Sequence, residues 1–138
     1  MLTQEFKIRV RYSETDQMGF VYYGNYAAYL EVGRVETLRA MGYPYKELED
    51  KGIMLPVVNL TINYKKPAVY DDLLTIKTSV RQIPSVKIIF ESEIFNAQGD
   101  LLVEASVTLV FIDATTKKPV KGPVDLLEKI TSYIKSGN

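Results

Sequence analysis

One segment of this sequence has the composition of a buried helix, and the segments after it have the patterns of strands. From Tyr26 to about Met41 the residues are apolar or small on nearly every side, which predicts a mostly buried helix that ends at Gly42. A polar helical turn is expected at 45–51. Alternating apolar residues then predict four strands, at 55–64, 73–81, 86–95 and 101–113. Because consecutive strands joined by turns pair antiparallel, the single long helix must lie across such a sheet.

Two further segments complete the expected fold. Residues 5–12 alternate strictly between apolar and mostly basic side chains, which predicts a strand with one solvated face. After a basic loop at 117–122, an apolar stripe predicts a short amphipathic C-terminal helix; its members are Leu126, Leu127, Ile130 and Ile134. The order of elements therefore predicts an α+β fold, with about five strands in one domain over residues 1–138.

Composition excludes several classes of function. The 17 basic residues balance the 17 acidic ones, so nothing in the charge favours a nucleic-acid partner. There is no apolar run of about 18 residues, which predicts a cytoplasmic protein without a membrane partner. The sequence has no His and no Cys, so it lacks an imidazole base, a thiolate nucleophile and the usual ligands of a structural zinc site. We expect no metal site and no bound cofactor.

The loop between the first strand and the long helix holds the best candidate for chemistry. Asp16 is a carboxylate placed shortly before a helix N-terminus, for which Asn25 or Gly24 is the expected N-cap. An isolated Asp in such a loop is more often a turn former or cap than a catalyst. Together with the partial positive charge at a helix N-terminus, however, a carboxylate can attack a polarised carbonyl carbon or act as a base toward an attacking water.

Residues 12–26 read YSETDQMGFVYYGNY, and Glu31, Arg34 and Glu36 follow on the helix. This segment resembles the 4-hydroxybenzoyl-CoA thioesterase type of acyl-CoA thioesterase, whose pattern is acidic-x-Asp-x-x-Gly-x-Val-x-His/Tyr-x-Asn-Tyr. These proteins have the hotdog fold, in which a curled antiparallel sheet wraps one long helix, and the element order of the whole chain agrees. Many relatives have His at the position of Tyr23, whereas the branch that acts on aromatic acyl groups has Tyr.

The resemblance implies hydrolysis of an acyl-CoA, or of an acyl thioester of acyl carrier protein, to a free acid and a thiol. It implies that Asp16 is the catalytic carboxylate, acting either as nucleophile or as general base. The N–H groups of Tyr23 or Gly24 would hold the oxyanion at the helix N-terminus. It also implies a homodimer with joined sheets, often paired into a homotetramer, with the active site between subunits. A binding or scaffolding module without turnover is the alternative.

Further residues are expected to contact the substrate. The loop and the first helical turn contribute Gly19, Val21, Tyr22, Asn25 and Tyr26. Basic residues suit the phosphates of coenzyme A, and the favoured candidates are Arg81 and Lys87, ahead of Lys65–Lys66 and the basic loop at 117–122. On the helix we expect i,i+3-type ion pairs among Glu31, Arg34 and Glu36, with a second catalytic carboxylate at Glu31 as the alternative.

Overall fold

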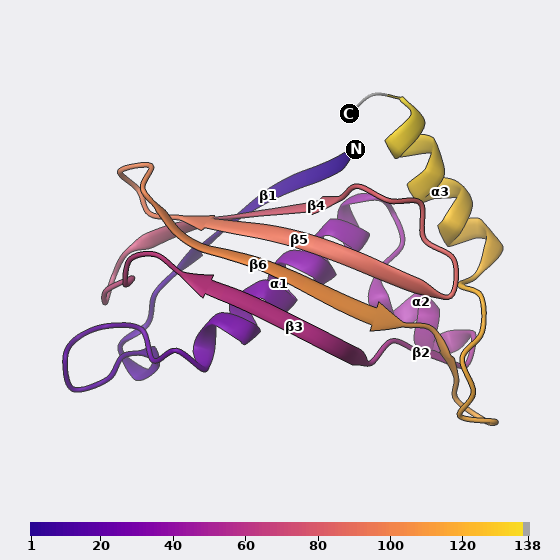
Figure 1. Ribbon diagram of the computed structural model, residues 1–138, viewed down its shortest axis with the longest axis horizontal. Coiled ribbons are helices and arrows are strands. Elements are labelled where there is room, and N and C mark those ends of the chain that lie inside the picture. Colours follow the sequence, from indigo (N-terminus) through magenta and orange to yellow (C-terminus); the bar gives the residue numbers. More distant parts are fainter. Residues whose placement is uncertain (137–138) are drawn as a thin grey trace.

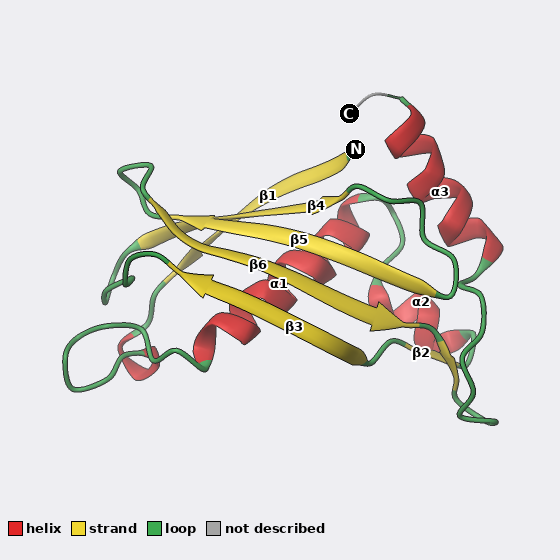
Figure 2. Cartoon of the chain, viewed as in Figure 1, coloured by secondary structure: helices red, strands yellow, loops and turns green. Residues whose placement is uncertain are grey.

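The computed structural model describes residues 1–136 and has one antiparallel sheet of five strands, in the order β1-β4-β5-β6-β3. Helix α1 lies across one face of this sheet (Figures 1 and 2). The main elements are β1 (Leu2–Arg9), α1 (Asn25–Ala40), α2 (Tyr45–Asp50), β3 (Val57–Tyr64), β4 (Leu73–Val80), β5 (Lys87–Phe95), β6 (Leu101–Val110) and α3 (Val124–Lys135). This confirms the predicted α+β hotdog fold, with its long central helix and short C-terminal helix.

The first strand begins and ends three residues earlier than predicted. It pairs with β4 from Leu2 opposite Val80 to Arg9 opposite Leu73. Tyr12, expected to end the strand, instead begins one turn of 3₁₀ helix, η1 (Tyr12–Glu14). The reason lies in the partner strand, because the turn before β4, with Asp71 at a φ of 70°, ends the ladder at that register.

Helix α1 buries one stripe against the sheet, and the rest of its surface stays open within one chain. The buried stripe consists of Tyr26, Tyr29, Leu30, Gly33, Thr37 and Leu38. Gly33 allows the closest approach, since a Cβ there would lie 2.5 Å from the Thr78 Oγ1 on β4. Ala27, Ala28 and Val32 are exposed, so the prediction of a helix buried on nearly every side was wrong for a single chain.

The last predicted strand, 101–113, is two strands in the structure. Strand β6 ends at Val110, where its N–H donates to the Pro56 carbonyl, and β7 (Ile112–Asp113) pairs with β2 (Ile53–Met54) in a separate small sheet. Helix α3 is amphipathic as expected and buries Leu126 and Ile130. None of the helices within residues 1–136 has the length and apolar character needed to cross a membrane.

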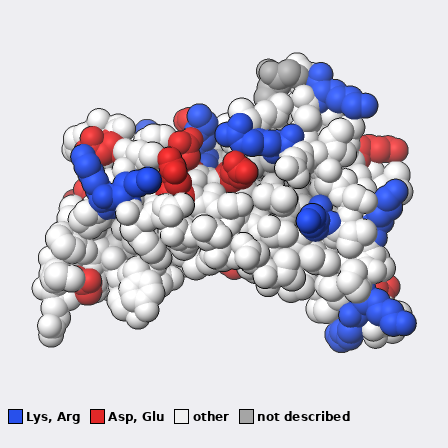
Figure 3. Space-filling model, viewed as in Figure 1, with Lys and Arg blue, Asp and Glu red and all other residues white. Residues whose placement is uncertain are grey.

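Strand β3 forms one edge of the sheet and is exposed along most of its length. It pairs with β6 on one side, and within the described residues no strand pairs with its other side. Val58, Leu60 and Tyr64 are between 41% and 59% exposed, which is unusual for large apolar side chains in a strand. Figure 3 shows few charged side chains along the lower middle of the molecule, where β3 lies in that view.

Candidate functional site

The loop that holds Asp16 is a compact turn with two strand-like flanks. The Asp16 N–H donates to the Phe20 carbonyl (2.8 Å), and Thr15 and Val21 form an isolated antiparallel bridge. Gly19, at a φ of 79°, closes the turn by donating its N–H to the Asp16 carbonyl (3.0 Å). A glycine is favoured here because this left-handed conformation strains other residues.

The Asp16 carboxylate is half-buried and held on one side only. Its Oδ1 accepts hydrogen bonds from the N–H groups of Met18 (2.9 Å) and Phe20 (3.3 Å). Within residues 1–136 its Oδ2 accepts no hydrogen bond. The loop therefore fixes the orientation of the carboxylate while one oxygen remains available to a substrate or a water molecule.

The first residues of α1 tie this loop to the helix. The Asn25 side-chain amide donates to the Glu14 carbonyl (2.8 Å), as does the Tyr22 N–H (2.9 Å). Asn25 is therefore the first helical residue rather than the N-cap. The N-cap is Gly24, the second of the two expected residues, and a glycine has no side chain with which to cap the helix. The side chain of Asn25 orients the loop instead of capping the helix.

Backbone donors are unoccupied at the N-terminus of α1. In the part of the chain that the structure describes, neither the Tyr23 N–H nor the Gly24 N–H donates a hydrogen bond, whereas the next two N–H groups bond to carbonyls of Tyr22 and Tyr23. The rings of Tyr22 and Tyr23 are exposed and lie 4.8 Å apart. A free pair of N–H groups at a helix N-terminus is suited to bind a negatively charged oxygen.

A second carboxylate, Glu14, links the start of the loop to helix α1. It accepts hydrogen bonds from the Arg11 N–H (2.8 Å) and the Tyr29 hydroxyl (2.9 Å), and it pairs with the Arg11 guanidinium (3.1 Å). Burial by itself would raise the pKa of Glu14, but the hydrogen bonds and the charge of Arg11 outweigh burial and hold the pKa below its ordinary value. Burial and this carboxylate together raise the pKa of Tyr29. Glu14 is thus a fully bonded structural anion.

Two of the expected substrate-binding residues lie in the core of the single chain. Tyr26 is 3% exposed, and its hydroxyl accepts the Ala68 N–H (3.1 Å). Val21 is 5% exposed and donates its N–H to the Ala68 carbonyl (2.9 Å). The Val21 N–H and the Tyr26 hydroxyl hold the loop and the helix against the segment before β4. Contact of either residue with a substrate stays a prediction.

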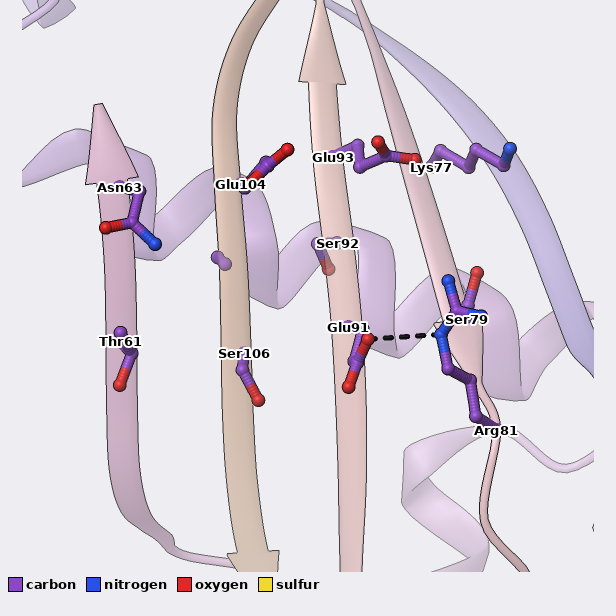
Figure 4. Close-up of a pocket in the computed structure, with 11 residues that line it drawn as sticks. Thr61, Asn63, Lys77, Ser79, Arg81, Glu91, Ser92, Glu93, Glu104 and Ser106 are labelled. Atoms are coloured by element: carbon purple, nitrogen blue, oxygen red, sulfur yellow. Dashed lines mark hydrogen bonds and ion pairs between the residues drawn. The ribbon is translucent and has the colours of Figure 1, made fainter. Parts of the chain in front are cut away.

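Arg81 and Lys87 lie at the other end of the sheet from Asp16. Strand β4 begins at Leu73, beside the Asp16 loop, and Arg81 follows its last residue, so about 24 Å of strand separates the two ends. Figure 4 shows Arg81 on the sheet face away from α1, where it pairs with Glu91 (3.1 Å) beside a polar hollow. Their assignment to the coenzyme A phosphates stays a prediction, and within one chain it requires a ligand that spans the sheet.

Lys65 and Lys66 lie at the same end of the sheet as the Asp16 loop. They follow Tyr64, the last residue of β3, whose ring contacts Tyr26 in the first turn of α1 (5.5 Å between centroids). Both lysines are exposed, and Lys66 lies 3.9 Å from Asp100. Only the sheet register could show that these lysines, and not Arg81, share an end of the molecule with Asp16.

A groove runs along α1 on the side of β3. One cavity is lined by Ala27 and Ala28 at the start of the helix and by Leu60 and Val107 of the sheet. A second cavity, of about 520 Å³, continues toward Leu38, Tyr45 and Phe90. The two share three lining residues: Glu31, Arg34 and Val57.

The ion pairs on α1 differ from those expected. Glu36 pairs with Arg39 (3.3 Å). Among residues 1–136 Arg34 makes neither an ion pair nor a hydrogen bond, so the expected pairing of Arg34 with Glu31 or Glu36 was wrong. The guanidinium instead lines the groove, where burial lowers the pKa of Arg34 and the nearby Glu31 carboxylate opposes that shift.

The fold and the Asp16 loop together define a thioesterase-type protein, and comparison with known families agrees. Residues 10–130 match the model of the thioesterase-like superfamily. The chain therefore belongs to the thioesterase-like superfamily.

Individual relatives are similar along most of their length. The chain is 36% identical to YneP of Bacillus subtilis over 115 residues, which are 83% of each protein. It is 35% identical to the acyl-CoA thioester hydrolase YbgC of Escherichia coli O157:H7 over 112 residues, which cover 81% of this chain and 84% of YbgC. The crystal structure of a DHNA-CoA thioesterase from Staphylococcus aureus superposes with a TM-score of 0.90 at 33% identity, covering 100% of this chain and 97% of that one.

Proposed function

We propose that this protein hydrolyses acyl-CoA thioesters, with Asp16 as the catalytic carboxylate and the N–H groups of Tyr23 and Gly24 as donors to the oxyanion. The observation that carries the proposal is the pair of unoccupied N–H groups at the N-terminus of α1, on the helix to which the Asp16 loop is bonded. The names of the similar proteins support the thioester substrate.

In this mechanism the thioester carbonyl oxygen accepts the two N–H groups and becomes negatively charged as the tetrahedral intermediate forms. Loss of such a donor in other acyl-transfer enzymes costs about 3–4 kcal/mol, so the pair supplies a large share of the catalysis. The hydrogen bonds to Asp16 Oδ1 leave Oδ2 to face the carbonyl carbon. The oxyanion is thus bound by backbone N–H groups of the chain, and the attack is made by the Asp16 side chain.

Two routes for Asp16 lead to the same products. As nucleophile, Oδ2 bonds to the carbonyl carbon, the carbon–sulfur bond breaks, and coenzyme A leaves as a thiolate that takes a proton from water. Water then hydrolyses the resulting mixed anhydride. As general base, Asp16 takes a proton from the attacking water and passes it to the leaving thiolate. A covalent acyl group on Asp16, found by mass spectrometry of the intact protein after rapid quenching, identifies the first route.

The test is thiol release from a panel of short, long and aromatic acyl-CoAs. Asp16→Asn keeps an acceptor for the N–H groups of Met18 and Phe20, so the loop is preserved while activity falls by about 10²- to 10⁴-fold. Asp113→Asn is a matched control, because Asp113 also accepts two loop N–H groups but lies in the small β2–β7 sheet. Full activity of folded Asp16→Asn would disprove the assignment, and no release by the wild type would favour a binding module.

We also propose that two copies of the chain pair along β3. The unpaired edge and the exposed Val58, Leu60 and Tyr64 support this, because an apolar edge strand in a soluble protein is normally covered. Light scattering after size exclusion should give at least the mass of a dimer, and a monomer at all concentrations would contradict the pairing. The tetramer and the cytoplasmic location stay predictions.

A further inference from the structure

We infer that the groove between α1 and β3 receives the acyl group of the substrate, and that Arg34 selects acyl groups with an oxygen acceptor at their far end. This rests on the proposed function, because the groove is assigned an acyl group only if a thioester binds at the start of α1. The acceptor is a hydroxyl or carboxylate oxygen on an otherwise apolar acyl group.

The position of the groove supports the acyl assignment. Its first lining residues, Ala27 and Ala28, lie within one turn of the Tyr23 and Gly24 N–H groups that would hold the thioester oxygen. The methyl groups of the two alanines leave space beside the helix. An acyl group attached to that carbonyl therefore has an open path along the helix, in the direction of Arg34.

The distance to Arg34 suits an acyl group of moderate length. From Asn25 to Arg34 the helix rises about 14 Å. Side chains of a helix lean toward its N-terminus, so the guanidinium lies nearer to the thioester position than the Arg34 Cα does. The cavity around it, of about 520 Å³, lies within the range of small-molecule sites in proteins.

Arg34 stands out from the apolar residues around it. Val35, Leu38, Leu55 and Phe90 line the same cavity and offer no side-chain acceptor to the guanidinium. The Tyr45 hydroxyl is also in the lining, but within residues 1–136 it makes no hydrogen bond with Arg34. A guanidinium has five N–H donors, and a partly desolvated cation without a partner is unfavourable. In the described residues it has no bonded partner, and the one acidic residue of the groove, Glu31, does not reach ion-pair distance.

An oxygen acceptor on the bound acyl group would satisfy this cation, whereas a purely aliphatic or unsubstituted aryl group would leave it unpaired. Selectivity then follows, because a site built to bind a polar group discriminates strongly against the analogue that lacks it. Arg34 is thus assigned as a specificity-determining residue.

The test compares two thioesters that differ only in the acceptor, 4-hydroxybenzoyl-CoA and benzoyl-CoA. Arg34→Met keeps the length of the side chain and removes the charge. It should lower kcat/KM for 4-hydroxybenzoyl-CoA by about 10- to 100-fold and leave kcat/KM for benzoyl-CoA unchanged or higher. Arg39→Met removes a cation of the same helix that is already paired with Glu36, and it should leave the ratio unchanged.

Other outcomes overturn the inference. Equal loss on both substrates, or an unchanged ratio, shows that Arg34 does not read the acyl group. Loss of the oligomer in Arg34→Met, with an unchanged ratio, assigns Arg34 to the subunit interface instead. If the wild type hydrolyses neither thioester, the proposed function fails, but the inference about Arg34 can still be tested. The affinities of both thioesters are then measured by calorimetry with Asp16→Asn and with the double variant Asp16→Asn, Arg34→Met. An equal affinity ratio in the two variants would overturn the inference.

Discussion

Gly33→Ala tests whether the fold depends on the close approach of α1 to the sheet. At an exposed position of a helix, replacing glycine with alanine stabilises the helix by about 1 kcal/mol. Here the added Cβ would lie 2.5 Å from Thr78 Oγ1 and 2.9 Å from Ile76 Cγ2, both on β4, which is paired on both sides. Overpacking of this kind costs about 1–3 kcal/mol. Two contacts below 3 Å put this cost in the upper half of that range, so after the gain in helix propensity we expect a net destabilisation of about 1–2 kcal/mol and a Tm lowered by roughly 5 °C.

The assay is urea unfolding at a fixed protein concentration, which keeps any contribution from association constant. Ala28→Gly is the matched control, since the reverse exchange at an exposed position of the same helix should also destabilise, by about 1 kcal/mol. In a Thr78→Ala background the cost of Gly33→Ala should shrink by at least about 0.5 kcal/mol, because one of the two clashes is gone. An increase in stability on Gly33→Ala would refute the contact.

Three further predictions concern the loop and the phosphates. Folding lowers the pKa of Glu14, so the wild type should be more stable than Glu14→Gln, with the full difference present above about pH 4.5. The difference should vanish as the pH falls through the folded-state pKa. Unfolding curves measured from pH 7 to 3 test this, and a difference that does not change with pH would refute it. Gly19→Val should cost about 1–2 kcal/mol more than Gly19→Asn, since a Cβ meets nothing there and only the positive φ is strained; equal unfolding midpoints would contradict this. The double change Lys65→Ala, Lys66→Ala should raise KM for an acyl-CoA more than Arg81→Ala does, and the reverse order in steady-state kinetics would return the phosphates to Arg81.

The sequence by itself determined the order of elements and the position of the catalytic candidate. Strict alternation and helical composition were sufficient for the fold class because the two periods differ and each marks one buried face. Residues 12–26 identified the loop through their resemblance to the thioesterase pattern. The structure gives a physical reason for Gly19, because its φ of 79° favours a glycine. Strand ends were less determined, as the shifted β1 shows, because register depends on the partner strand.

The tertiary structure alone decided which residues share a site. It placed Lys65–Lys66 at the Asp16 end and Arg81 at the opposite end, because antiparallel pairing reverses direction at each strand. It also left Arg34 unpaired in an apolar groove, although i,i+3 spacing along the helix suggested an ion pair. Sequence spacing reports only which side chains could meet along one element. The packing of that element against β3 and α2 determines which of them reach water, a partner or a cavity.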